Sequence, residues 1–284
     1  SYDPFVVSAK PPLDKAGDPE EPTAVMDSNL VPGDIYVVPY NNAPALEAMF
    51  EKNASKIACF IVEPVLENLA IILPDAGYLE RVRELCDEYN VILIFDEVKT
   101  GLTAGAHGAS VRLGVEPDLI TLAKSIGGGV PLAAFGGKKK YMDFVTNGKM
   151  AHFGTFNGNP LAMAGVRAID RLCSDQALAD AEALNQQALD RISEIIDEYQ
   201  LPAHTVGFGV KGCVTWSTTP VRNYRDYKAT DFGIAEAHWL FALNRGIITP
   251  PGLDEQWLIS LAHGQTEIDL LVEDFREFAK ALRA

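Results

Sequence analysis

The sequence lacks the features that mark several common classes of protein. Cysteine is rare, with 4 in 284 residues, and no two stand at a short paired spacing, so neither a disulfide framework nor a cysteine-ligated zinc site is indicated. The 5 histidines show no HxxH or HExxH spacing, and we expect no metal. No apolar stretch approaches the roughly 20 residues that span a bilayer, and no signal peptide is visible.

Positive charge is also scarce. Lysine and arginine number 24 against 39 aspartates and glutamates, a formal net charge of −15, so nucleic acid and anionic membranes are disfavoured as partners. The acidic residues gather in helical stretches such as 80–88 and 190–198, which is typical of a solvated face. The composition therefore predicts a soluble, cytoplasmic protein with one sizeable core and a second, smaller domain.

Short apolar runs alternate with amphipathic stretches in the first part of the chain. Apolar residues recur at three- and four-residue spacing over 77–89, which predicts a helix. Such alternation predicts an α/β fold with a mainly parallel sheet flanked by helices. Residues 1–40, rich in proline, aspartate and glycine, are expected to be irregular. The strand-like runs are 57–62, 91–95, 119–123 and 132–135.

The second part of the chain predicts a smaller α+β domain that begins near residue 170. A helical pattern starts near Asn159, and a second long one covers 176–199. The remaining predicted elements are strands within 207–216, a helix over 231–244, a strand and turn over 246–251, and a closing helix over 266–282.

Two of the predicted strands deliver side chains that can do chemistry. Asp96, followed by Glu97, comes after the run at 91–95, and Lys124 comes after the run at 119–123. Ligands gather at the carboxyl ends of parallel strands, where both residues should lie. A pyridoxal-phosphate enzyme needs this pair, because the lysine forms a Schiff base and the carboxylate keeps the pyridine nitrogen protonated. Taken singly, the lysine could extend to solvent and the acidic pair could cap a helix.

A small, hydroxyl-bearing turn offers a place for a phosphate. Gly154 and Thr155 lead into the apolar helix that starts near Asn159, and backbone N–H groups at a helix start attract anions. Together with Asp96 and Lys124, this turn favours the cofactor hypothesis over separate structural roles.

The ordered set of motifs resembles the class III aminotransferases of fold type I, in the branch of glutamate-1-semialdehyde 2,1-aminomutase and its relatives. The resemblance runs over essentially the whole chain. It implies that residues 1–169 are the C-terminal portion of the large pyridoxal-phosphate-binding domain and that 170–284 form the small C-terminal domain. The motifs are FDEV at 95–98, TLAK at 121–124 before GGG at 127–129, GT at 154–155 before GNPLAM at 158–163, VEPV at 62–65, PDL at 117–119 and SLAH at 260–263.

The resemblance also implies roles for individual residues. Lys124 would carry the internal aldimine of pyridoxal 5'-phosphate and then move a proton between substrate carbons. Asp96 would pair with the pyridinium nitrogen, and Val98 would pack on one face of the ring. Thr155 would bind the phosphate of the neighbouring subunit's cofactor, which implies a homodimer with shared active sites.

Three further residues match the substrate side of the family's site. Glu63 would orient groups near the cofactor edge, or else simply end a strand. Asn68 stands where many ω-aminotransferases carry a glutamate, and the asparagine favours the aminomutase branch. Glu255 matches a glutamate of the aminomutase's substrate region.

The sequence also departs from the family pattern. Glu67 replaces an expected glycine, and KTGLT at 99–103 replaces the branch's usual Met-Thr-Gly-Phe-Arg. The loss of that arginine removes a cation near the entrance of the active site. The C-terminal part of the chain also has no unambiguous arginine that would bind a substrate carboxylate. The start of the chain resembles a point inside the family's sequence, so we expect about a hundred or more preceding residues, with a phosphate loop and a ring-stacking aromatic, to be absent.

Three functional hypotheses remain open. The first is an aminotransferase that moves an amino group between an amine or amino-acid donor and a keto acid or aldehyde acceptor, both small molecules. The second is an intramolecular aminomutase of the glutamate-1-semialdehyde type. The third is an incomplete, non-catalytic fragment that cannot hold the cofactor.

Overall fold

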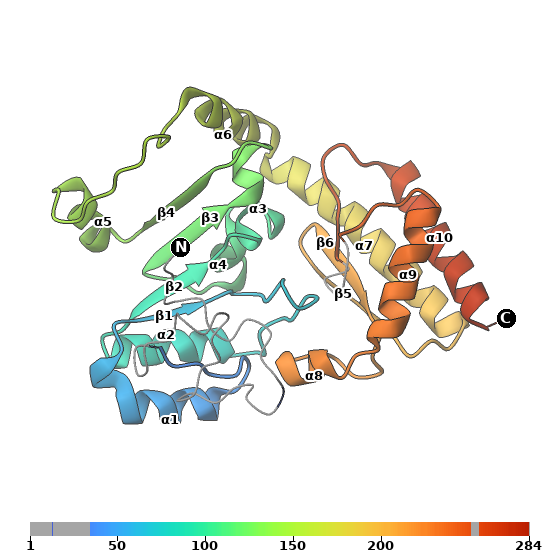
Figure 1. Ribbon diagram of the computed structural model, residues 1–284, viewed down its shortest axis with the longest axis horizontal. Helices are drawn as coiled ribbons and strands as arrows, with labels where there is room; N and C mark the ends of the chain where they lie inside the picture. Colours follow the sequence, from blue (N-terminus) through green and yellow to red (C-terminus); the bar gives the residue numbers. More distant parts are fainter. Residues whose placement is uncertain (1–12, 14–34, 251–255, 284) are drawn as a thin grey trace.

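The computed structural model describes residue 13, residues 35–250 and residues 256–283. A four-stranded sheet and a three-stranded sheet lie in separate halves of the molecule, each accompanied by helices (Figure 1). Most of the stretch predicted to be irregular, 1–40, falls outside the described residues, and residues 35–40 form neither helix nor strand. No helix in the described part of the chain is long and apolar enough to cross a membrane.

The four-stranded sheet has the order β1-β2-β3-β4, which is also the order along the chain. The first three strands are parallel, and the last pairs with β3 in the antiparallel sense. The central strand β2 is apolar enough to bury Leu93 and Phe95 completely. The mainly parallel sheet predicted from the sequence is confirmed. Its strands are β1 (Cys59–Val62), β2 (Ile92–Asp96), β3 (Leu119–Ala123) and β4 (Ala133–Gly137).

Helices pack against this sheet through apolar stripes. On α2 (Tyr78–Glu88) the residues spaced three and four apart face the core, as predicted, and Val82 and Cys86 are completely buried. Burying a side chain of this size stabilises the fold by about 1.5–3 kcal/mol. The other helices of this half are α1 (Ala43–Asn53), the 3-10 turn η1 (Ala54–Lys56), α3 (Thr100–Thr103), α4 (Gly108–Leu113), η2 (Lys124–Gly127), α5 (Lys139–Thr146) and α6 (Pro160–Leu172).

The second half is built on an antiparallel sheet of order β5-β6-β7. Its core gathers Trp216, Ile192, Phe275 and their apolar neighbours from the surrounding helices. Ser174 begins the longest helix by accepting a hydrogen bond from the N–H of Ala177 at 3.2 Å. The elements are α7 (Asp175–Glu198), β5 (His204–Phe208), β6 (Lys211–Thr215), α8 (Tyr224–Lys228), α9 (Phe232–Asn244), β7 (Gln256–Leu258) and α10 (Gln265–Arg283).

One predicted strand is wrong. Residues 246–250 form no strand, and the third strand of the small sheet is β7 instead. The carbonyl of Thr249 accepts a hydrogen bond from the indole N–H of Trp239 at 3.2 Å, which is a side-chain contact and not a bond to a neighbouring strand. Pro250 has no N–H with which to pair a neighbouring strand. The apolar run at 247–248 therefore follows α9 as irregular chain.

The two halves meet where the β5–β6 turn touches α3. The N–H of Val210 donates to the carbonyl of Thr103 at 2.9 Å. Gly209 has φ +60°, and a Cβ at this position would lie 1.9 Å from the oxygen of Thr103, so only glycine fits. The boundary after residue 169 stays a prediction, and it would fall within α6.

Candidate functional site

Asp96 and Lys124 lie at the carboxyl ends of adjacent parallel strands. Asp96 is the last residue of β2 and pairs in register with Thr121 of β3. Lys124 directly follows the last residue of β3 and opens η2. Sequence pattern alone placed both residues at this edge, and the register of the two strands brings them to the same end of the sheet.

The backbone of Lys124 is unusual. Its φ is +53°, in the left-handed region that residues other than glycine, asparagine and aspartate rarely adopt. The side chain is exposed. Strained backbone of this kind costs on the order of 1–3 kcal/mol and clusters at functional sites. The strain and the exposed amine mark this lysine as a group that can react with a ligand.

The carboxylate of Asp96 is held in place by two donors. The N–H of Val98 donates to Oδ1 at 3.0 Å, and the hydroxyl of Thr121 donates to the same oxygen at 3.3 Å. Asp96 and Val98 are both half-buried. The second oxygen, Oδ2, is the one that could accept from a protonated ring nitrogen, and the valine beside it offers an apolar contact for a ring.

Glu97 has a different role from its neighbour. It is completely buried, and its carboxylate accepts from the N–H groups of Ala109 at 2.6 Å and Ser110 at 2.9 Å and from the hydroxyl of Thr100 at 3.2 Å. These N–H groups belong to the first turn of α4. The alternative that the acidic pair caps a helix therefore applies to Glu97. Asp96, the last residue of β2, does not cap α4.

Glu63 and Asn68 are brought together after β1. The amide of Asn68 donates to Glu63 Oε1 at 3.0 Å, and the N–H of Glu67 donates to Oε2 at 3.2 Å. Burial raises the pKa of Glu63, the charge of Asp96 raises it further, and the two hydrogen bonds together with the charge of Lys99 oppose the rise. Glu63 directly follows Val62, which pairs with Phe95, so it lies at the same strand ends as Asp96. Asn68 is held to it by the hydrogen bond.

Sequence reasoning missed a buried ion pair next to these residues. Lys211 of β6 lies 2.5 Å from Glu67 Oε2, with side chains 8% and 0% exposed. Lys99 donates to the carbonyl of Glu67, and the amide of Gln256 donates to the same carbonyl at 2.8 Å. Burial raises the pKa of the Glu67 carboxyl, and Lys211 and then Lys99 oppose that rise. The only sign of this ion pair in the sequence was Glu67 itself, which replaces an expected glycine; nothing in the sequence indicated Lys211 as its partner.

Other predicted residues are not joined to this group. Thr155 lies exposed in a turn between α5 and α6, and no hydrogen bond or ion pair within the described ranges links it to Asp96 or Lys124. Glu255 lies outside the described residues. His263 bonds locally, where its Nδ1 accepts from the N–H of Ser260 at 2.8 Å. Across the residues that the structure describes, no cluster of three or more histidine, cysteine, aspartate or glutamate side chains could hold a metal ion.

Comparison with known proteins points to one family. A sequence model of "Aminotransferase class-III" matches residues 24–236. A glutamate-1-semialdehyde 2,1-aminomutase of Thermomicrobium roseum is 37% identical over 246 residues, which are 86% of this chain and 57% of that protein. The enzyme of the same name from Francisella philomiragia is 35% identical over 273 residues, 94% of this chain and 62% of its own length.

Solved structures agree. An ω-transaminase from Sphaerobacter thermophilus superposes with a TM-score of 0.86 at 27% identity, covering 98% of this chain and 64% of that one. A β-phenylalanine aminotransferase from Variovorax paradoxus gives a TM-score of 0.82 at 28% identity, covering 91% and 60%. The chain spans about three fifths of the length of these relatives.

Proposed function

Because the chain belongs to the class III aminotransferases, we propose that it acts as a pyridoxal-phosphate-dependent aminotransferase. It would move an amino group between an amine or amino-acid donor and a keto acid or aldehyde acceptor. The observation that carries the proposal is the placement of Asp96 and Lys124 at the ends of adjacent parallel strands. This edge of an α/β sheet is where ligands bind.

The residues at this edge fit the cofactor. The exposed amine of Lys124 would hold it covalently, and Asp96, fixed through Oδ1, would face the ring nitrogen. Val98 would pack against the ring. When bound, the cofactor supplies an electron sink for the bond that breaks at the substrate carbon.

The chain's own groups would then handle the proton. A carboxylate at Asp96 stabilises positive charge on the ring nitrogen, which keeps the sink effective. The Nζ of Lys124, once released by substrate, would take the proton from one carbon and return it to another. Glu63 and Asn68, joined by their 3.0 Å hydrogen bond, would line the substrate side. We keep Glu255 as a further substrate contact on the strength of the sequence match alone.

We also propose a homodimer in which Thr155 binds the phosphate at the partner's site. Apolar side chains around Thr155 point to solvent, with Phe153 93% and Phe156 80% exposed, and Leu161 on α6 is exposed as well. These exposed apolar side chains support the proposed interface with a second copy of the chain. A cytoplasmic location suits the free thiols of all four cysteines.

An aminomutase is the second candidate. The two relatives described above carry that name, and the sequence resemblance implies asparagine for that branch at the position of Asn68. The two activities share their first half and differ in whether the amino group leaves for a separate acceptor. Product formation that is independent of any added acceptor would favour the mutase, and strict dependence on an acceptor would favour the transferase.

Reductive trapping tests the site itself. The chain would be incubated with pyridoxal phosphate, reduced with borohydride and mapped by peptide mass spectrometry. We expect the adduct on Lys124, and its loss in a folded Lys124→Ala variant. Lys139, whose side chain is 85% exposed, is an internal control for non-specific labelling.

Trapping on Lys139 at the same level as on Lys124, or none on Lys124 in the folded chain, would contradict the assignment. The latter result would favour the third hypothesis, in which the chain alone cannot hold the cofactor.

A further inference from the structure

The segment that follows β1 is tied to the second half of the molecule by one buried carboxylate. Glu67 reaches Lys211 of β6, 144 residues away, through a 2.5 Å ion pair. Both side chains are buried, so water screens the pair little. The contact fixes where residue 67 lies relative to the small sheet.

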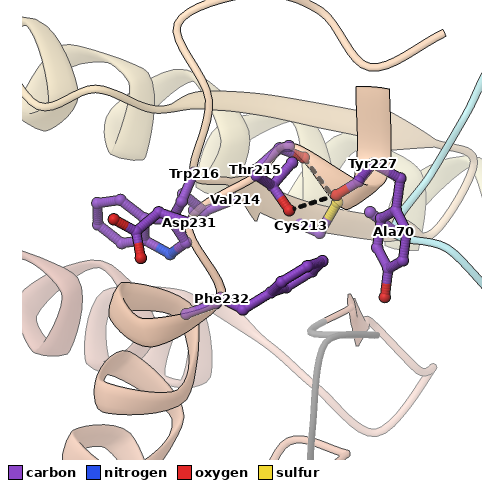
Figure 2. Close-up of a pocket in the computed structure, with 10 residues that line it drawn as sticks. Ala70, Cys213, Val214, Thr215, Trp216, Tyr227, Asp231 and Phe232 are labelled. Carbon is purple, nitrogen blue, oxygen red and sulfur yellow. Dashed lines mark hydrogen bonds between the residues drawn. The ribbon is translucent and has the colours of Figure 1, made fainter. Parts of the chain in front are cut away.

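Backbone contacts strengthen the same connection. The carbonyl of Glu67 accepts from Lys99, next to α3, and from Gln256 of β7. The amide of Gln256 also donates to the carbonyl of Ala70. Ala70 lines a cavity together with Cys213 and Tyr227 of the second half (Figure 2). Residues 67–70 therefore dock on the small sheet at both ends.

Glu67 is also connected to two of the predicted substrate-side residues, Glu63 and Asn68. Its N–H and the amide of its neighbour Asn68 bind the two carboxylate oxygens of Glu63, one each. Glu63 in turn directly follows β1 at the end of the sheet where Asp96 ends β2, because Val62 pairs with Phe95. A shift of Glu67 would consequently displace Glu63 and Asn68 together.

Stability alone does not explain why this ion pair is buried. Glu67 Oε1 has no hydrogen-bond partner in the part of the chain that the structure describes, although it is buried. A buried pair with an unsatisfied oxygen is commonly no more stabilising than two apolar side chains of the same volume. Glu67 replaces a glycine expected from the family pattern, and Lys99 stands in a second departing segment. Two departures from the pattern thus meet at one buried group.

We propose that Glu67 and Lys211 are positioning residues, whose ion pair sets the placement of Glu63 and Asn68 beside Asp96. The proposal rests on the function proposed above for what is positioned, but the placement itself is a property of the folded chain. It makes the substrate side of the site dependent on where β6 lies. Specificity would then respond to the small domain through this pair.

The side-chain amide of Asn68 provides a direct readout that needs neither cofactor nor turnover. In protein labelled with ¹⁵N-asparagine, its NH₂ resonance would be assigned by its loss in Asn68→Asp. We expect Glu67→Gln and Lys211→Met each to shift or broaden this resonance. Lys211→Arg, which keeps the positive charge, should leave the Asn68 resonance close to its original position.

Asp274→Asn is the matched control. Asp274 is also a buried carboxylate, and one of its oxygens has no hydrogen-bond partner among the described residues, while Arg245 lies 2.6 Å from the other; it lies on α10. It should lower the melting temperature and leave the Asn68 resonance in place. If either single variant fails to fold, Glu67→Gln combined with Lys211→Met removes both buried charges, and the resonance should still be displaced.

An Asn68 resonance that stays at its original position in the folded variants would overturn the proposal. So would an equal displacement in Asp274→Asn, because the effect would then reflect general loosening. Failure of the proposed function is read separately, from the absence of a trapped adduct on Lys124 in the unsubstituted chain.

Discussion

Adjacent acidic residues with opposite roles give the sharpest test of the site. Glu97→Gln would place an amide nitrogen against one of the two N–H groups that now donate to the carboxylate at 2.6 and 2.9 Å. A buried N–H left without an acceptor costs about 1–3 kcal/mol, and the remaining hydrogen bonds lose the strength that a charged acceptor gives. We expect a total loss of about 3 kcal/mol in the free energy of unfolding.

Asp96→Asn should instead leave the stability nearly unchanged and slow the reaction. The amide oxygen of asparagine can still accept from Val98 and Thr121, so the free energy of unfolding should change by less than about 1 kcal/mol. The reaction should slow about a hundredfold or more, because a neutral amide cannot stabilise the protonated ring nitrogen.

Urea denaturation and single-turnover rates on both variants would measure the two effects. For a chain of this size, a loss of about 3 kcal/mol lowers the melting temperature by roughly 5–10 °C. The reasoning fails if Glu97→Gln keeps its stability, or if Asp96→Asn reacts at nearly the unsubstituted rate. In the second case Asp96 would be only a structural residue.

Two other predictions concern acid stability and the dimer. His238 packs against Phe278, Phe275 and Trp216, and burial lowers its pKa from 6.5 to about 4. The unfolded chain therefore binds this proton first as the pH falls below 6.5, so the free energy of unfolding should drop by up to about 3 kcal/mol by pH 4. Denaturation of His238→Leu should lack this drop, whereas His107→Leu, at a side chain 69% exposed, should retain it. For the dimer, mixing inactive Lys124→Ala and Thr155→Ala subunits should restore about a quarter of the sites if each site takes Lys124 from one subunit and Thr155 from the other; no recovery after verified subunit exchange would contradict shared sites.

The sequence predicted those features that depend on local pattern. Apolar runs bounded by turns located β1 to β4, and a parallel sheet then required Asp96 and Lys124 to lie at one edge. The physical basis is short range, since side-chain periodicity and chain connectivity suffice. Glu63 and Asn68 were assigned to the substrate side from the family resemblance, and the hydrogen bond between them was not predicted.

Features that depend on long-range packing were not accessible in this way. Nothing local distinguishes Glu97 as a cap from Asp96, because the N–H groups it binds are twelve and thirteen residues further along the chain. The partner of Glu67 is 144 residues away. The run at 246–251 looks like a strand by composition, but residues 246–250 form none, and the third strand of the small sheet is β7. Each of these outcomes was decided by tertiary contacts that override local preference.

The left-handed backbone of Lys124 has a consequence for how the protein would respond to selection. Glycine adopts φ +53° without the steric cost that lysine bears, so the chain would be more stable with glycine at this position. A screen that rewards stability alone would therefore discard the one amine on which the proposed chemistry depends. A lysine held in this unfavourable conformation is the pattern expected where stability is given up for activity at a single residue.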